Sequence, residues 1–128
     1  MIQDSETVSL LAFFTLPVVI FVLGLWFKHN PPKEINKLKG YRTRRSMSSQ
    51  VAWDFAQIYS AGLMIKAALP TLIVAAAGSS FMKYAGGISK EVYIAVVLIG
   101  QTLFLFPIYF MTEAKLKKIV PEEDKEEK

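Results

Sequence analysis

The 128-residue sequence lacks cysteine and contains one histidine, His29. The absence of cysteine excludes disulfides and thiolate chemistry. With one histidine beside Lys28, neither a Ser/His/Asp set nor a metal-ligand spacing can be assembled. A Gly-rich phosphate loop is also missing. We therefore expect a protein that is not an enzyme, with no catalytic residues, no metal site and no cofactor.

Charged residues are absent from two long stretches, residues 8–27 and residues 92–111. Each is about 20 residues long and would cover about 30 Å as a helix, which matches the hydrocarbon core of a bilayer. Hydrophobic residues make up 52% of the chain, and the mean hydropathy is +0.33. Runs of this length cannot be buried in so small a soluble core, so we predict transmembrane helices over residues 8–27 and 92–112.

A weaker apolar stretch, residues 51–78, lies between these runs and is interrupted by Asp54, Lys66 and Pro70. It is longer than one span, so we expect a helix that begins at the membrane surface near Trp53 and then crosses. The crossing must be helical because lipid offers no partner to an unpaired backbone group. The predicted fold class is all-α, an integral membrane protein with three transmembrane helices.

Four polar segments flank or join these helices. They are an N-terminal segment over residues 1–7, a basic connector over residues 28–50, a loop over residues 79–91 and a charged tail over residues 113–128. The tail ends in a run of charged residues without apolar ones, so we expect disorder or a frayed helix there.

The charges are distributed unevenly around the three spans. Only Asp4 and Glu6 precede the first span, whereas residues 28–50 hold seven Lys or Arg and one Glu. This bias predicts the N-terminus and the 79–91 loop outside, and the connector and C-terminus inside. The same connector accounts for the high isoelectric point. We expect it to attract anionic lipid headgroups, and we expect no direct nucleic-acid binding, because it lacks interleaved aromatic residues.

The connector and the start of the second helix also carry a motif. Residues 31–62, "PPKEINKLKGYRTRRSMSSQVAWDFAQIYSAG", resemble the signature of the SdpI family of small bacterial membrane proteins. The matching positions are Pro32, Asn36, Gly40, Tyr41, Arg42, Thr43, Ser46, Trp53, Ala56 and Gly62. The chain departs from the pattern at Gln57, where the family usually has asparagine.

The resemblance implies a multi-pass protein of the bacterial cytoplasmic membrane that protects against a secreted peptide toxin arriving from outside. It also implies a cytoplasmic transcriptional repressor as a second partner, held at the membrane. Two alternatives from other classes stay open. One is a small transporter or channel-like subunit, a homo-oligomer in which Lys66 lines a polar path between protomers. The other is a structural adaptor whose connector binds anionic lipid.

Several motif residues suggest a folded cap on the second helix. Gly40 can adopt a positive φ and turn the connector, and a serine before residue 50 suits the helix N-cap. Arg42 could make bidentate contact with Asp54, with a lipid phosphate or with a partner's carboxylate. In this cap we expect Tyr41 to pack near Trp53. The simpler alternative for Arg42 is a solvated topological charge, as for the lysines around it.

Trp53, Ala56, Gln57 and Ser60 share one helical face. Trp53 could serve only as an interfacial anchor, while Gln57 and Ser60 could hydrogen-bond a neighbouring helix.

Lys66 lies near the middle of the second span by counting along the sequence. A charge there costs several kcal/mol unless it is paired, hydrated or snorkelling, so Lys66 is a functional candidate. Pro70 frees the carbonyl of Lys66, and we expect Gln101 and Thr102 as neighbours in a small polar pocket. The alternative is a shifted helix from which Lys66 snorkels.

Overall fold

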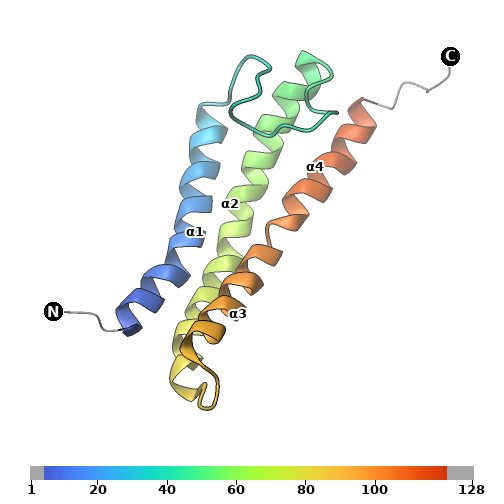
Figure 1. Ribbon diagram of the computed structural model, residues 1–128. Coiled ribbons are helices and arrows are strands. Elements are labelled where there is room, and N and C mark those ends of the chain that lie inside the picture. The colour runs from blue at the N-terminus through green and yellow to red at the C-terminus, as the bar shows by residue number, and fades with distance from the viewer. Residues whose placement is uncertain (1–4, 121–128) are drawn as a thin grey trace.

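The computed structural model describes residues 5–120. Its helices are α1 (Ser5–His29), α2 (Gln50–Phe81), the short 3-10 helix η1 (Met82–Tyr84), α3 (Lys90–Leu103) and α4 (Phe106–Ile119) (Figure 1). Within these residues there is no strand, and the predicted all-α fold class is confirmed. The stretches Glu6–His29, Gln50–Tyr84 and Lys90–Ile119 are each long and apolar enough to cross a membrane, as the three-span prediction requires.

Two of the helix ends follow from local sequence. α1 ends at His29 because Pro31 follows closely, and the residue before a proline is disfavoured in helical geometry. α2 begins at Gln50 because Ser49 caps it, with the Ser49 Oγ accepting a hydrogen bond from the Ala52 N–H at 3.1 Å. This confirms the expected serine N-cap.

The third apolar stretch forms two helices, α3 and α4, instead of the single helix expected over residues 92–112. Pro107 has no N–H, and its ring crowds the carbonyl of Leu103, which interrupts the helix. The N–H groups of Phe104 and Leu105 turn back to the carbonyls of Gln101 and Thr102.

Helical structure also continues beyond the expected boundaries. α4 runs on to Ile119, so the first residues of the predicted charged tail are helical. α2 and η1 together reach Tyr84, into the predicted 79–91 loop. The tail residues 121–128, and residues 1–4 of the N-terminal segment, lie outside the described part of the chain.

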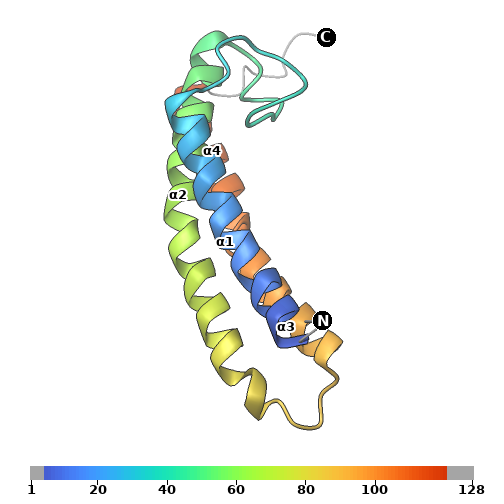
Figure 2. The same ribbon diagram turned by 90° about the vertical axis from the view of Figure 1, so that its left-hand side faces the viewer.

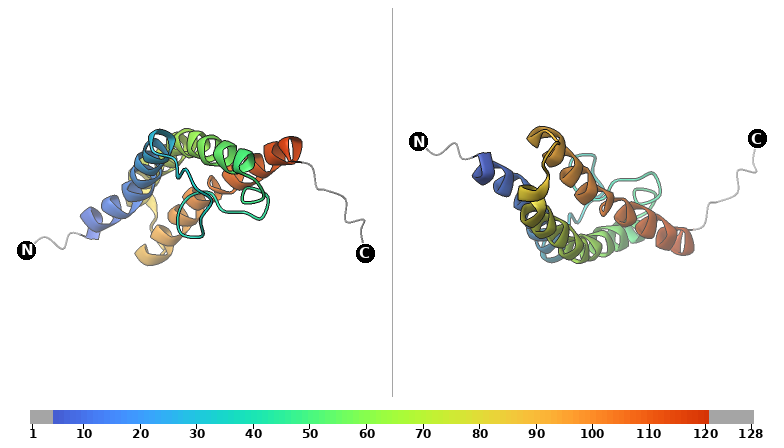
Figure 3. Two further views of the ribbon diagram at one scale, coloured as in Figure 1. Left: turned by 90° about the horizontal axis from the view of Figure 1, so that it is seen from above. Right: turned by 90° about the horizontal axis from the view of Figure 1, so that it is seen from below.

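α2 is the central helix and packs against α1, α3 and α4, while α3 also contacts α1 (Figures 1 and 3). Close backbone approach sets the register between α1 and α2. A Cβ on Gly24 would lie 2.9 Å from Ile65 Cγ1 and 3.1 Å from the Ala61 carbonyl oxygen. Gly78 lies just as close to Val97 of α3, since a Cβ there would be 2.8 Å from Val97 Cγ1.

The buried core is small. Phe13, Ala75 and Val97 form one cluster, and Ala52, Ala56 and Leu116 form a second near the connector. Most large apolar side chains of the helices point outward instead, among them Leu11, Trp26, Leu69, Ile73 and Phe110. Apolar surface this extensive is typical of a membrane-facing protein.

Candidate functional site

The motif residues meet at one end of the bundle, where residues 31–49 fold onto α2 and α4. We call this folded segment the connector cap. Figure 2 shows it extending to one side of the helices, near the end of α1. The opposite end, where η1 leads into α3, is called the loop end.

Gln57 binds the main chain of Tyr41 through both ends of its amide. The Tyr41 N–H donates to Gln57 Oε1 at 2.7 Å, and Gln57 Nε2 donates to the Tyr41 carbonyl at 2.8 Å. Gln57 is buried on α2, so this pair holds the connector against the helix in a single position. The longer side chain of glutamine therefore makes a precise contact at the position where the chain departs from the family pattern.

Gly40 makes this contact sterically accessible. Its φ is +99°, a conformation that side-chain-bearing residues rarely adopt. A Cβ at Gly40 would also overlap Gln57 Oε1 and come within 2.9 Å of Pro32 Cγ. Both the turn and the close approach of Gln57 therefore require glycine at this position. The positive φ expected for Gly40 from the sequence is confirmed.

A carboxylate on α4 binds the other side of the cap. The Tyr41 hydroxyl donates to Glu113 Oε1 at 2.9 Å, and Thr43 Oγ1 donates to the same oxygen at 2.6 Å. Tyr41 also packs against the cluster of Ala52, Ala56 and Leu116. Glu113 was missed by the sequence analysis, although one signal marks it: it is the single acidic residue between positions 92 and 120.

The Tyr41–Glu113 contact affects the protonation of tyrosine. Burial raises the pKa of the Tyr41 hydroxyl well above its usual range, and the hydrogen bond to Glu113 and its negative charge raise it further. The hydroxyl therefore stays protonated at neutral pH and remains a hydrogen-bond donor.

We expect Glu113→Ala to detach the cap from α4 while leaving it attached to α2. Each lost hydrogen bond to a charged acceptor is worth about 2 kcal/mol before relaxation. Glu113→Gln keeps an acceptor oxygen and serves as the matched control. The measurement is the rate of tryptic cleavage in the connector, which should rise for alanine and change little for glutamine. Equal rates for the two variants would contradict a role for this oxygen.

Two buried side chains complete the contacts of the cap, Ser46 from within it and Trp53 from α2. Ser46 is fully buried; its Oγ accepts from the Thr43 N–H at 2.8 Å, and its N–H donates to Thr43 Oγ1 at 3.1 Å. Trp53 Nε1 donates to the Pro32 carbonyl at 2.6 Å and is likewise fully buried. Trp53 thus holds the cap from the first turn of α2, rather than serving as an exposed interfacial anchor. It binds the start of the connector, while Tyr41 is directed toward α4.

Arg42 and Asp54 do not form the pair that the sequence suggested. The Arg42 guanidinium donates to the Lys37 carbonyl, and Asp54 Oδ1 accepts from Gln50 Nε2 at 2.7 Å. Both side chains are exposed. Asn36 stabilises the turn before Gly40. Its Oδ1 accepts hydrogen bonds from two successive backbone N–H groups, those of Leu38 and Lys39, both at 3.0 Å.

The polar pocket expected around Lys66 is not formed. Lys66 is exposed on α2, whereas Gln101 is fully buried and donates from Nε2 to the carbonyls of Phe13 at 2.8 Å and Thr71 at 3.2 Å. Thr102 bonds within its own helix to the Ile99 carbonyl. The physical reason lies in α1, since Pro17 leaves the Phe13 carbonyl without its helical donor. Gln101 supplies that donor, a signal that the sequence analysis overlooked.

The expected interhelical bonds of Gln57 and Ser60 are also different in the structure. Gln57 binds the connector, as described, and Ser60 Oγ donates to the Gln57 carbonyl within α2 at 3.3 Å.

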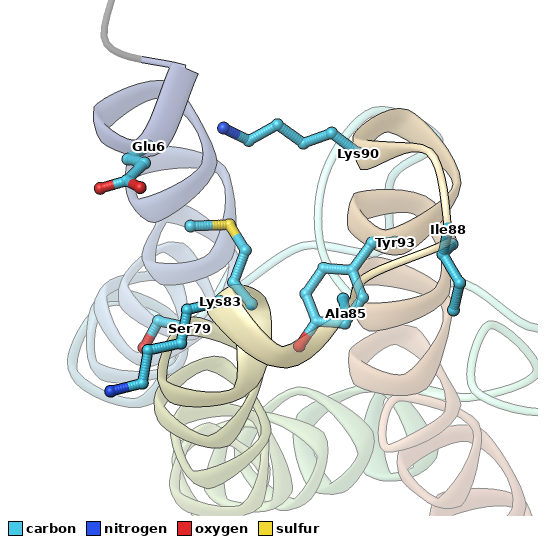
Figure 4. A pocket seen from close by; sticks show the side chains of 8 residues that line it. Glu6, Ser79, Lys83, Ala85, Ile88, Lys90 and Tyr93 are labelled. Carbon is cyan, nitrogen blue, oxygen red and sulfur yellow. The ribbon is translucent and has the colours of Figure 1, made fainter.

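The loop end carries a pocket of about 400 Å³ between the start of α1, the end of α2 and the start of α3 (Figure 4). Its lining combines charged, aromatic and apolar groups: Glu6, Ser79, Met82, Lys83, Ala85, Ile88, Lys90 and Tyr93. The Tyr93 hydroxyl braces this wall by donating to the Gly78 carbonyl at 2.8 Å. In Figure 4 the Lys90 side chain extends from α3 toward the first turns of α1.

Comparison with known proteins agrees with the motif. Residues 33–111 match the SdpI/YfhL protein family. A relative from Bacillus subtilis (strain 168), described as "Uncharacterized protein YfhL", is 37% identical over 99 residues, covering 77% of this chain and 80% of the relative. No solved structure matches the chain. The family match covers residues 33–49 of the connector cap and its Gln57 contact on α2, while Glu113 lies just beyond it. The chain belongs to the SdpI/YfhL family.

Proposed function

We propose that the chain crosses a bacterial cytoplasmic membrane three times, with the N-terminus and loop end outside and the connector cap and C-terminus inside. The excess of basic residues in the connector supports this orientation. Trp26 and Tyr109 are both exposed near the connector end, where they would mark the level of the membrane interface, since aromatic residues gather at both interfaces.

The packing of α1 against α2 indicates how deep Lys66 lies in the membrane. Gly24 lies against Ala61 and Ile65, so the end of the first apolar run at Phe27 is level with about residue 60 of α2. Lys66 is then only about 9 Å inside that boundary. Its side chain leans toward the helix N-terminus, which is the cytoplasmic side in this placement, so the ammonium can reach the headgroups. The register thus favours the snorkelling alternative.

Reporter fusions test the orientation. A fusion at Lys37 should give a cytoplasmic signal and a fusion at Gly87 an external one, because basic residues near span ends are retained inside. The opposite pattern would overturn the proposed placement.

Within this placement we propose an SdpI-like immunity function. The chain would confer resistance to a secreted peptide toxin met at the outer face, and the connector cap would carry the response to a repressor in the cytoplasm. Family membership supports this proposal. The observation that carries it is the cap, in which motif residues spread over positions 32–57 converge through hydrogen bonds to α2 and α4. Orientation alone needs only charge and would not require such a fold.

The loop-end pocket and the break in the third span add to the proposal. The pocket lies on the face that a toxin would meet first. α3 forms one wall of that pocket, and α4, beyond the break at residues 104–105, carries Glu113 to the cap. A change at the pocket could therefore reach the cap through the third span.

A toxin challenge tests the proposal. A sensitive bacterium expressing the chain should survive concentrations of a secreted membrane-active peptide that kill cells carrying the empty vector. Glu113→Ala should reduce this protection and Glu113→Gln should keep it. Equal killing with and without the chain, across a panel of such peptides, would reject immunity. Ion or solute flux through the purified chain in liposomes would then favour the transporter alternative.

A further inference from the structure

Two segments at the connector end carry opposite charge. The connector cap is basic, and five of its cations are exposed: Lys33, Lys37, Lys39, Arg42 and Arg44. The chain beyond α4 is acidic, because residues 122–127, "EEDKEE", hold five acids and one lysine. We call these six residues the acidic tail. They lie outside the described part of the chain, but their sequence gives them a net negative charge.

The positive charge of the cap is mostly unbalanced among residues 5–120. The cap holds six basic residues and one acid, Glu34. Two further acids lie beside it, and the hydrogen bonds given for both come from neutral groups. Glu113 accepts hydrogen bonds from the hydroxyls of Tyr41 and Thr43, and Asp54 accepts one from the Gln50 amide. The cap therefore presents cations to which a further acidic group can bind.

The acidic tail starts beside the cap. Val120 packs against the buried cluster near the connector, and Tyr41 of the cap packs against the same cluster. α4 ends at Ile119, and Val120 has φ −125° and ψ 87°, an extended geometry that is favoured before a proline such as Pro121. The chain therefore leaves the axis of α4 at the point where this helix meets the cap.

Two exposed arginines of the cap lie within reach of the tail. Arg42 and Arg44 flank Thr43, which binds Glu113 on α4, and Figure 1 shows the connector passing across α2 toward the end of α4. Glu113 lies about two turns before Val120, which is about 10 Å along the helix. Six residues beyond Val120 can span about 20 Å, so the tail can return to these arginines.

We propose that the acidic tail docks on the connector cap, with its carboxylates paired to the guanidinium groups of Arg42 and Arg44. Each exposed ion pair is weak, but a guanidinium can bind a carboxylate through two hydrogen bonds. The short tether also gives the tail an effective concentration of about a millimolar or more. The tail then occupies cations that anionic headgroups would otherwise attract. This docking is independent of toxin immunity and of which membrane face carries the cap.

Paramagnetic relaxation enhancement tests the docking in the full-length protein. The chain has no cysteine, so Lys128→Cys provides a unique site for a nitroxide label at the end of the tail. The protein is reconstituted in phosphatidylcholine nanodiscs with and without phosphatidylglycerol, and the Thr43 amide signal is recorded. The matched control replaces the five acids of the tail by glutamine or asparagine. It keeps the tether length and therefore reports the effect of tethering alone.

We expect the relaxation enhancement at Thr43 to be at least about twofold larger with the acidic tail than with the neutral tail. The difference should shrink at about 0.5 M salt, because exposed ion pairs are screened. Equal enhancement for the two tails would overturn the docking. Loss of the difference in nanodiscs containing phosphatidylglycerol would also overturn it, since headgroups would then cover the arginines in place of the tail.

Two double variants identify the surface that the tail binds. Arg42→Gln combined with Arg44→Gln should abolish the difference between the acidic and neutral tails. Lys117→Gln combined with Lys118→Gln removes the same charge from exposed positions at the end of α4 and should leave most of the difference. The opposite ranking would show that the tail pairs with its own helix and would overturn its assignment to the cap.

Discussion

Gly40→Ala is expected to open the connector cap and to raise tryptic cleavage of the connector about 100-fold. Alanine at a positive φ costs about 1 kcal/mol, and the overlap of its Cβ with Gln57 Oε1 would break two hydrogen bonds worth about 1 kcal/mol each. The sum of about 3 kcal/mol corresponds to about a 100-fold larger open population. Protection against toxin, where it depends on the cap, should be lost as well.

The measurement uses vesicles in which the connector faces the protease. The cap contains several trypsin cleavage sites, namely Lys33, Lys37, Lys39, Arg42, Arg44 and Arg45. When opening is fast relative to cleavage, the rate reports the open population. Gly62→Ala is the matched control, because Gly62 is also a motif glycine but has no atom within 4 Å of the added Cβ. Similar cleavage rates for the two variants would show that the Gly40 turn does not hold the cap.

Gln57→Leu is expected to release the connector from α2 with little effect on the helix itself. Leucine fills a similar volume but removes the partner of the Tyr41 N–H, and an unpaired buried donor costs about 1–3 kcal/mol. The Tyr41 carbonyl keeps a second donor, since Ser46 Oγ reaches it at 3.1 Å. The loss of the hydrogen bond should therefore be detected first at the Tyr41 N–H.

Hydrogen exchange of the connector measures this effect directly. The Tyr41 amide should exchange about 10-fold faster or more in Gln57→Leu, because its acceptor is gone. Gln57→Asn restores an amide on a shorter side chain and should give an intermediate rate. Unchanged exchange in the leucine variant would mean that the Gln57–Tyr41 contact does not hold the connector.

The span count could be predicted because it depends on local composition. A run of about 20 uncharged residues crosses lipid as helix whatever its neighbours do, with at most a local break such as the one before Pro107. The serine N-cap of α2 and the end of α1 before Pro31 could be predicted for the same reason, because each depends only on residues adjacent in the sequence. The motif likewise identified Gly40, Tyr41 and Gln57 as residues of the site, although not how they contact each other.

The partners of the polar residues were decided by tertiary structure. Glu113 meets Tyr41 across 72 positions, and Gln101 meets Phe13 across 88. Such contacts depend on how far one helix slides along another, and the close packing of Gly24 on Ala61 and of Gly78 on Val97 sets that register. The sequence showed that Lys66 and Asp54 were charged residues in unusual places. Only the packed helices showed that both side chains face outward. The composition of a segment determines whether it can cross a membrane, whereas the alignment of neighbouring helices determines which residues its side chains contact.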